Sequence, residues 1–486
     1  MHNSKPQLHS TPLPREGLRG WGLLTKPTYM RTITEPSRQL PVRAEVDILV
    51  VGGGPSGIIA AEAAAGKGLR VMLLESRGYL GGNLTIGLPI LSFLNCNGKQ
   101  NIRGLAQNFI DRLRRDGNAS EHKPCKLHMS LTIINPEAAK DVALEIMEEK
   151  GIEVLMYTFV ADVITEGRRV KGVIIESKAG REAILAKTII DCTGDGDVAQ
   201  RAGVAMKKGD DSGGMQPPTL MYSMRGVDID KLRDAIVNHH DEFDMDRMPA
   251  EQFATGKFIT VGLRNQIRKA LEAGIKIPVA RTILITGLNP DEIWVNMTRV
   301  NGVDSTLPES YTRGEIEARK QIREINKYLR QFVPGFENAW LDRIAPFMGI
   351  RESRVMQGRY ILTAEDILAS RRFAHVVAVA SYPVDIHHAN GSDCTMLFTT
   401  DDYDIPFECL LPREYDNLLV AGRCASMNHE AMAATRVMST CMALGEAAGR
   451  AARIAQETGV EPADVEIEAL QRELRETGAY LGEHAL

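Results

Sequence analysis

Patterned cysteines are missing from this sequence. Its seven cysteines stand at positions 96, 125, 192, 394, 409, 424 and 441, and no two of them are three positions apart. This spacing excludes a CxxC redox pair and the cysteine sets that bind zinc or iron–sulfur clusters, so no metal site is expected. An odd, unpatterned number of thiols is typical of a reducing cytoplasm, which is the expected location. Any electrons that the protein handles must pass through an organic cofactor, oxygen or a separate carrier.

Long apolar runs and a strong charge of either sign are also missing. No stretch approaches the roughly 18 apolar residues that a membrane helix needs, and the N-terminus lacks the layout of a secretory signal. The formal net charge is only -5 over 486 residues, whereas nucleic-acid binding usually requires a basic surplus. We therefore expect a globular protein with no membrane span and no nucleic-acid partner.

The strongest motif follows a short apolar run at residues 46–51, which is typical of a strand buried on both faces. The next six residues fit GxGxxG. In such a loop the first glycine permits a tight turn, the second lets the backbone approach a pyrophosphate, and the third lets the following helix pack on the strand. The N-terminus of that helix attracts phosphates. The predicted contacts here are Gly52, Gly54, Pro55, Ser56 and Gly57.

An acidic residue completes the unit. An alanine-rich helix is predicted over residues 55–67 and a strand over 70–74, which ends at Glu75 and Ser76. A carboxylate at this point accepts hydrogen bonds from an adenosine ribose and favours a free 2′-hydroxyl. Strand, loop, helix, strand and acid occur in the required order, so the sequence predicts a dinucleotide site rather than a glycine turn of an unrelated fold.

Segments outside this unit favour FAD over a nicotinamide. Gly81, Gly82 and Asn83 lie where glutathione-reductase-like flavoproteins carry a second glycine pair near the flavin. A later strand, predicted over residues 183–191, runs into Thr193, Gly194 and Asp195. That turn resembles a second nicotinamide loop, but its two acids, Asp195 and Asp197, would repel a pyrophosphate. Val160, in the strand-rich segment before it, is also among the predicted cofactor contacts.

The C-terminal segment predicts a second flavin contact. A strand over residues 417–421 runs into Gly422 and Arg423, and Arg436 is predicted to open a helix over 436–456. The N-terminus of such a helix can face the flavin N1/O2 edge, where negative charge collects on reduction. A tightly packed core helix is the alternative interpretation of its small residues.

The order of the predicted elements along the chain indicates an α/β domain that is interrupted by an inserted domain. Residues 1–43 are punctuated by proline and are interpreted as an arm that packs on the body or on a second subunit of a homo-oligomer; a transit peptide is the alternative. Residues 44–210 and 385–486 are predicted to form a Rossmann-like FAD-binding domain with a parallel sheet. Residues 211–384 alternate like antiparallel strands and are predicted to form an α+β substrate or cap domain.

These motifs together resemble a known family. The chain is similar to bacterial FAD-dependent oxidoreductases related to the flavoprotein subunits of fumarate reductase and succinate dehydrogenase, over roughly residues 38–480. The resemblance implies an FAD domain built from both ends of the chain, but no particular substrate. The segments that carry it are DILVVGGGPSG, ESRGYLGGN, IIDCTGDGDVAQRAG, FMGIRESR, SYPVDIHH and DNLLVAGRCASMNHEAMAATRVMSTCMALGEAAG.

Three clusters supply candidate catalytic groups. Arg351, beside Glu352 and Arg354, either joins an ion-pair hinge or clamps a substrate anion. His387 and His388 follow Asp385 on an extended segment, so only one of the two is expected to face the flavin, and the carboxylate can orient His387.

The third cluster contains His429, which precedes the C-terminal helix and is the second choice for an acid or base. A structural role is the competing interpretation of each histidine. The leading hypothesis is hydride transfer between a small hydroxyl- or carboxylate-bearing molecule and flavin N5, with an unidentified electron acceptor or donor. The alternatives are an NAD(P)H-dependent monooxygenase and a flavin-carrying electron-transfer subunit.

Overall fold

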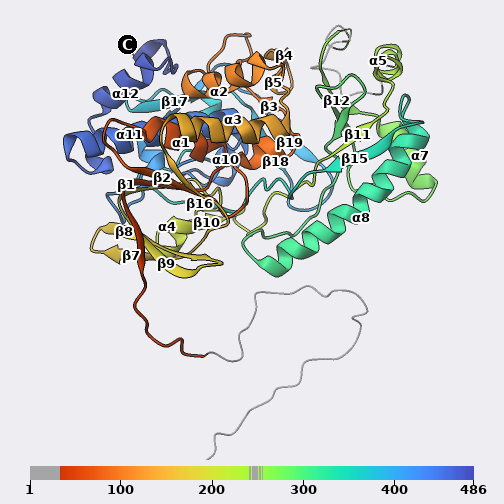
Figure 1. The fold of residues 1–486 in the computed structure, drawn as a ribbon. Helices are drawn as coiled ribbons and strands as arrows, with labels where there is room; N and C mark the ends of the chain where they lie inside the picture. Colours follow the sequence, from red (N-terminus) through yellow and green to blue (C-terminus); the bar gives the residue numbers. More distant parts are fainter. Residues whose placement is uncertain (1–32, 240–241, 243–249, 251–252, 254, 486) are drawn as a thin grey trace, which may run out of the picture.

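A seven-stranded sheet forms the centre of the larger of two lobes in the computed structural model (Figure 1). The structure describes residues 33–239 and 255–485, together with 242, 250 and 253. The strand order is β6-β2-β1-β9-β8-β7, with β21 pairing alongside β9. The strands are β1 (Val42–Val51), β2 (Val71–Leu74), β6 (Glu153–Leu155), β7 (Phe159–Glu166), β8 (Arg169–Ser177), β9 (Gly180–Asp191) and β21 (Leu418–Val420).

Five of these strands run parallel, and β7 and β8 turn back as an antiparallel extension. Strand β2 and the last four residues of β1, Ile48–Val51, are apolar and buried, as expected for parallel strands that are covered on both faces. The helices of this lobe are α1 (Pro55–Ala64), α2 (Gly104–Arg115), α3 (Pro136–Glu149), α4 (Asp197–Arg201), α9 (Ala364–Leu368), α10 (His429–Thr435), α11 (Met438–Thr458) and α12 (Ile467–Glu476).

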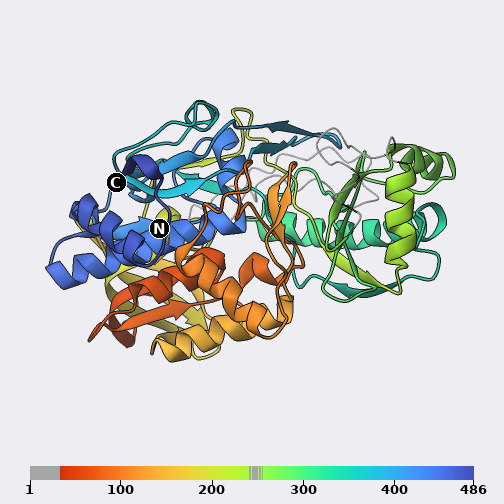
Figure 2. The same cartoon turned by 90° about the horizontal axis from the view of Figure 1, so that it is seen from above.

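A five-stranded antiparallel sheet forms the smaller lobe, which lies beside the larger one when the molecule is seen from above (Figure 2). Its strands are β12 (Ile259–Gly262), β13 (Thr282–Thr286), β14 (Ile293–Val295), β11 (Tyr222–Arg225) and β15 (Trp340–Ile344), in spatial order. Its helices are α5 (Ile229–Asn238), α7 (Arg264–Glu272) and α8 (Pro308–Phe332). The predicted mixed α/β fold with a parallel sheet and separate antiparallel strands is thus confirmed.

Small sheets connect the lobes and shape the space between them. Three strands pair as β3 (Ile90–Leu91), β5 (Met129–Thr132) and β4 (Lys123–Cys125), and three further pairs are β10 (Met206–Lys208) with β16 (Arg354–Met356), β17 (Val376–Ala380) with β20 (Tyr403–Pro406), and β18 (Val384–His387) with β19 (Cys394–Leu397). Among the described residues, no helix is both long and apolar enough to cross a bilayer.

Two predicted helices have different bounds in the structure. The helix expected over residues 55–67 ends at Ala64, since the chain turns outward at Ala65 with an extended ψ of 126°. The helix expected over residues 436–456 begins two residues later, as α11, and the short helix α10 precedes it. Asn428 caps α10, Arg436 ends it, and the extended backbone of Val437 (ψ 148°) separates it from α11. Arg436 therefore lies at a helix C-terminus, not at the N-terminus that was predicted to face the flavin.

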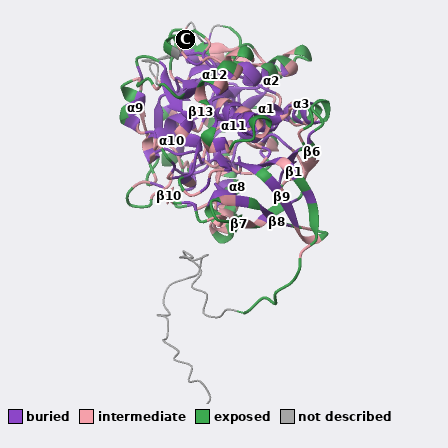
Figure 3. Cartoon of the chain, turned by 90° about the vertical axis from the view of Figure 1, so that its left-hand side faces the viewer, coloured by how far each residue is buried: buried purple, intermediate pink, exposed green. Residues whose placement is uncertain are grey.

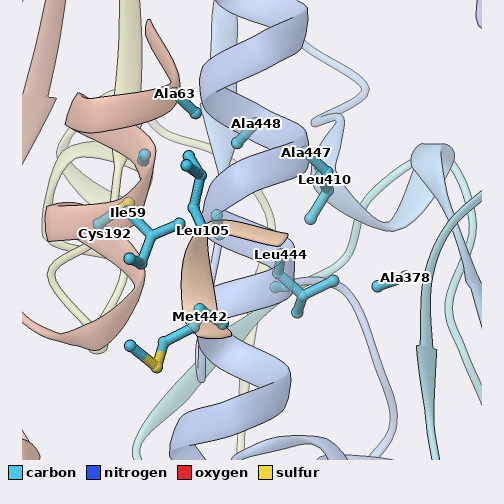
Figure 4. Packing of buried hydrophobic residues seen from close by; sticks show 14 of the residues in the cluster. Ile59, Ala63, Leu105, Cys192, Ala378, Leu410, Met442, Leu444, Ala447 and Ala448 are labelled. Atoms are coloured by element: carbon cyan, nitrogen blue, oxygen red, sulfur yellow. The ribbon is translucent and has the colours of Figure 1, made fainter. Parts of the chain in front are cut away.

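The ends of the chain meet where α1 packs on α11. Because two glycines of α11 lack side chains, the two backbones come into contact: a Cβ atom at Gly445 would lie 2.2 Å from the Ser56 carbonyl oxygen, and one at Gly449 would lie 2.2 Å from the Ala60 carbonyl oxygen. Small and apolar side chains fill the remaining space (Figure 4). Buried residues concentrate around these two helices, and exposed ones lie at the periphery (Figure 3).

Packing also bears on the predicted domain boundaries. The apolar cluster around α1 and α11 includes Val355, Leu362 and β17, whereas the cluster of the smaller lobe includes Met348, Tyr382 and Val437. Each cluster thus has members on both sides of residue 384, and the boundary at that residue stays a prediction. Residues 1–32 of the predicted arm, and hence its predicted docking, lie outside the described residues.

A buried carboxylate in α11 makes stability pH-dependent. Glu446 accepts hydrogen bonds from the Leu105 amide (3.0 Å) and the Thr477 hydroxyl (2.8 Å), and burial raises its pKa to about 7. A carboxyl whose pKa is raised in the folded state binds more protons there than in the unfolded chain. Stability is therefore lost as the pH rises from the unfolded pKa, near 4.5, through the folded one.

We expect the Glu446→Gln variant to be more stable than the natural protein at pH 8, by an amount on the order of 3 kcal/mol if the whole shift is realised. The Thr477 hydroxyl can turn to the Leu474 carbonyl (3.0 Å) and accept from the new amide. Urea unfolding from pH 5 to 8 measures the effect. An equal fall of stability with pH in both proteins would contradict it.

Candidate functional site

A cavity of about 640 Å³ lies at the carboxyl ends of β1 and β2, where α1 begins. Gly52 turns the chain with φ +98°, and a Cβ atom there would lie 2.6 Å from the Cys192 carbonyl oxygen. At Gly57 a Cβ atom would lie 1.7 Å from the Gly52 carbonyl oxygen, whereas at Gly54 it would meet no atom within 4 Å. The first and third glycines thus serve packing, and the second opens the backbone to the cavity.

Glu75 holds the glycine loop in place. Its buried carboxylate accepts the Gly53 amide at 2.8 Å, the Arg77 amide at 2.8 Å and the Ser76 hydroxyl at 3.0 Å. The same side chain lines the cavity. It can therefore order the loop while presenting a carboxylate at the end of β2, where an adenosine ribose is expected.

The acids that were expected to repel a pyrophosphate are paired in the structure. The Arg423 guanidinium donates to Asp195 Oδ1 at 2.7 Å and to the Ser353 hydroxyl at 2.7 Å, and Arg354 bonds Asp197 at 2.5 Å. Burial alone would raise the pKa of Asp195, but the Arg423 charge and the Ser353 hydroxyl outweigh it and lower that pKa. This network joins β9, β16 and the end of β21 at one wall of the cavity.

Most of the predicted cofactor residues line this cavity. The exceptions are Gly57, inside the helix contact, and Gly81, whose amide donates to the Gly53 carbonyl at 2.8 Å. Both support the loop without lining the space. Those that line it are Gly52, Gly54, Pro55, Ser56, Glu75, Ser76, Gly82, Asn83, Val160, Thr193, Gly194, Asp195, Gly422, Arg423 and Arg436.

A second cavity, of about 140 Å³, adjoins the first. One wall comes from β12 and β13 of the smaller lobe and is apolar, and the opposite wall comes from β18 and the start of α11. The two cavities share four lining residues, Asn83, Ile350, Arg436 and Met438. A molecule in the second cavity would therefore lie next to the inner end of the first.

Asp385 is the centre of the polar wall. Its Oδ2 atom lies 3.2 Å from the Tyr382 hydroxyl, 3.4 Å from His387 Nε2 and 3.5 Å from an Arg436 nitrogen. Burial alone would raise the pKa of this carboxyl, but His387 and Arg436 lower it strongly. Burial, together with the nearby Arg351 charge, lowers the pKa of His387 to about 4, so the imidazole is neutral at pH 7.

The other two predicted histidines lie elsewhere. His388 is exposed, and its Nε2 atom contacts the Thr395 hydroxyl at 3.0 Å. His429 is buried, with Nδ1 2.7 Å from a Glu352 carboxylate oxygen, which raises its pKa despite burial. Neither residue lines either of the two cavities. Of the three predicted histidines, His387 alone lines one of these two cavities, and their catalytic roles stay predictions.

Arg351 lines the second cavity and forms no ion pair with Glu352, which was one of the two interpretations of this cluster. Its guanidinium donates to the Pro217 carbonyl (2.5 Å) and the Thr219 hydroxyl (2.7 Å), which are both neutral. Burial, and then the positive charge of Arg436, lower its pKa to about 9. A buried cation with neutral partners favours an anion in the adjoining space.

Sequence reasoning missed His128 and Tyr382, which also line the second cavity. Their rings stack with centroids 6.2 Å apart. No motif surrounds His128 in the sequence, because its only connection to β18 is through space. The doublet at 387–388 drew attention to the neighbouring segment, but Tyr382 carried no signal of its own.

The first cavity fits FAD. The backbone at Gly54 is open to it, and Glu75 and the paired acids line it. The buried Nε atom of Arg436, which also lines it, has no hydrogen-bond partner among the described residues. Such a glycine-loop cavity defines a dinucleotide-binding α/β enzyme. The chain matches the model of the family described as "FAD dependent oxidoreductase" over residues 47–474 and belongs to that family. It is an FAD-dependent oxidoreductase.

Curated relatives match parts of the chain. A thiamine thiazole synthase of Aeropyrum pernix is 36% identical over 129 residues, which are 26% of this chain and 43% of that protein. A digeranylgeranylglycerophospholipid reductase 1 of Methanococcoides burtonii is 26% identical over 208 residues, 39% of this chain and 47% of that protein. The chain thus spans about half the length of the curated relatives it matches.

Solved structures are similar over most of the chain. A geranylgeranyl bacteriochlorophyll reductase-like protein of Thermoplasma acidophilum has a TM-score of 0.47 at 14% identity and covers 89% of this chain and 84% of its own. The p-nitrophenol 4-monooxygenase PnpA of Pseudomonas putida has a TM-score of 0.46 at 12% identity, over 86% and 82%.

Proposed function

We propose that the protein is a dehydrogenase or reductase that acts on a small hydroxyl- or carboxylate-bearing molecule in the second cavity. Bound FAD supplies a two-electron group that accepts or donates a hydride. The observation that carries the proposal is the junction of the two cavities: four residues line both, and neutral imidazole and buried guanidinium groups lie beside that junction. Acid–base chemistry and anion binding are thereby available next to the cofactor's place.

The lining of the second cavity supports this substrate class. Three guanidiniums line this cavity, those of Arg281, Arg351 and Arg436, together with the carboxylate of Asp385. Arg281 pairs with Asp393 at 2.9 Å, so the other three groups leave one positive charge that a single carboxylate on the substrate would reduce. The apolar wall from β12 and β13 would contact the carbon skeleton. A volume of about 140 Å³ favours a small molecule.

The proposal retains several sequence-based expectations. These are a relation to the fumarate reductase and succinate dehydrogenase flavoproteins, a bacterial source, a cytoplasmic location and assembly as a homo-oligomer. It also retains an FAD-binding domain formed from both ends of the chain and a substrate domain between them. The predicted bounds of that substrate domain are residues 211–384.

Anaerobic reduction of the bound flavin tests the function. Glycolate, lactate, malate, glycerol and glucose are added separately to the FAD-loaded protein, and bleaching of the yellow absorbance is followed. The reverse reaction is tested with dithionite-reduced protein and enoates. At least one compound is expected to change the flavin's redox state, and a panel without any effect would count against the proposal.

The Arg351→Gln variant is expected to raise the concentration of a carboxylate substrate needed for half-maximal reduction by about 30-fold or more, since a charge-assisted contact worth roughly 2 kcal/mol or more is lost. Arg359→Gln is the matched control, because Arg359 pairs with Asp416 at the surface, outside both cavities. Equal half-reduction concentrations in Arg351→Gln and the natural protein would remove Arg351 from the substrate site.

A further inference from the structure

His128 lies in the turn between β4 and β5 and lines the second cavity. Its Nδ1 atom is 3.7 Å from Cys125 Sγ, and its ring stacks on Tyr382. Its Nε2 atom makes no hydrogen bond within the described part of the chain. One nitrogen of this imidazole is therefore available to a molecule in the cavity.

His387 has a different environment. An Arg299 nitrogen lies 3.4 Å from its Nδ1 atom, and Asp385 Oδ2 lies 3.4 Å from its Nε2 atom. A guanidinium can only donate and a carboxylate only accept. The neutral ring must therefore keep its lone pair on Nδ1, facing Arg299, and its proton on Nε2, facing Asp385. Both nitrogens are thus engaged, so His387 is poorly placed to accept a proton from a substrate.

We propose that His128 is the group that exchanges a proton with the substrate, and that His387 is a positioning residue that fixes the Asp385 carboxylate. This inference rests on the proposed function. In the oxidation direction the substrate O–H bond breaks and an N–H bond forms at His128 Nε2. The O–H electron pair becomes the second bond of the carbonyl, and the C–H electron pair leaves as a hydride. The substrate loses two electrons, which the oxidised FAD named above accepts.

The charges near His128 suit this role. Burial lowers its pKa to about 4, and the Asp385 carboxylate opposes that shift, so the ring is neutral at pH 7 and able to take a proton. Cys125 and Tyr382 contact the ring, and burial keeps both of them protonated at this pH. Asp385, held by His387 and Arg436, can stabilise the imidazolium once it forms.

Flavin reduction by the most effective compound of the panel gives the first test. His128→Asn is expected to slow reduction 100-fold or more at pH 7, the usual range for loss of a general base. The natural protein is expected to react more slowly below about pH 5, where His128 becomes protonated, and the variant should lose this pH dependence. His387→Asn is expected to stay within tenfold, because an amide can donate to Asp385 and accept from Arg299. His387→Leu can do neither, so its rate of flavin reduction should begin to fall at a higher pH than that of the natural protein.

Histidine acylation gives a test that needs no substrate. Diethyl pyrocarbonate attacks neutral imidazole nitrogens, and peptide mass spectrometry locates the product on the FAD-loaded protein at pH 6.5. His128 should be labelled at least tenfold faster than His387. His122 is the matched negative control, since Thr132 (2.6 Å) and Gln107 (2.8 Å) engage both of its nitrogens, and exposed His388 is the positive control.

The two tests separate the inference from the proposed function. If the natural protein reacts with some compound but His128→Asn reacts equally fast, the assignment of His128 is overturned and the proposed function stands. Preferential labelling of His387 overturns the assignment as well. If no compound reacts, the proposed function fails, and the role of His128 that rests on it falls too, even where the labelling shows a free nitrogen.

Discussion

Gly445→Ala is expected to destabilise the protein by about 2 kcal/mol or more and to weaken its retention of FAD. The added methyl would lie 2.2 Å from the Ser56 carbonyl oxygen and 2.9 Å from its carbonyl carbon. Backbone atoms cannot move aside as a side chain can, so α1 and α11 must separate, and overpacking of this kind costs roughly 1–3 kcal/mol or more. Ser56 lies in the first turn of α1 and lines the FAD cavity, so the displacement also disturbs the phosphate end of the cofactor's place.

Gly314→Ala is the matched control. Gly314 also lies inside a helix, α8, but its Cβ would meet only the ends of the Met348 and Val303 side chains, both at 2.9 Å. The Met348 methyl is the end of a flexible side chain and can move aside, and the Val303 methyls are side-chain atoms that must shift, so the loss should be smaller than where backbone is met. Alanine also favours a helix over glycine by about 1 kcal/mol. Thermal unfolding and FAD retention on gel filtration measure both variants. If both lower stability equally, close packing of α1 on α11 is not the reason.

Arg423→Gln is expected to lower the free energy of unfolding by about 3 kcal/mol, the range measured when one partner of a buried ion pair is removed. Asp195 would keep only the Ser353 hydroxyl, at 2.5 Å, and its lowered pKa would rise because Arg423 is one of the main causes of that shift. Stability of this variant should also become less sensitive to acid, since a carboxyl with a depressed pKa contributes stability that is lost as the pH falls.

Two further variants make this experiment specific. Adding Asp195→Asn to Arg423→Gln should recover much of the loss, because no unpaired charge then remains. Arg168→Gln breaks a more exposed pair with Asp416, whose atoms lie 2.7 Å apart, and should cost less than about 1 kcal/mol. Urea unfolding at pH 7 measures all three. A loss in Arg423→Gln no larger than that in Arg168→Gln would show that the Asp195 pair contributes little.

The part of the cofactor cavity around the glycine loop was predictable because its residues are close in sequence. The turn at Gly52, the open backbone at Gly54 and the carboxylate of Glu75 belong to one strand–helix–strand unit, so their spacing alone specifies their geometry. Arg423 was also predicted as a cofactor contact. Its pairing with Asp195, however, joins residues 228 positions apart, and no local pattern predicts such a contact.

The second cavity was less predictable, because its two walls come from different lobes. The period of an extended strand correctly placed Asp385 and His387 on one face of β18. His128 could not be found in this way, since its turn is far from β18 in the sequence and is near it only in the folded protein. The short helix α10 before Arg436 was not predicted. The contact of Arg436 with Asp385, 51 positions away, was missed for a similar reason, because helical propensity carries no information about it.

The place of β21 in the central sheet has a consequence for synthesis of the chain. β9 pairs with β21 through Ile189, Ile190 and Asp191, whose partners are Leu418, Leu419 and Val420. A ribosome that has just completed β9 must still add more than two hundred residues before that strand is available, and α11, which covers α1, emerges later still. The nascent N-terminal half therefore carries an uncovered apolar surface throughout elongation and is a natural client for chaperones. Chains that stop short of α11 are expected to aggregate rather than accumulate as a folded fragment.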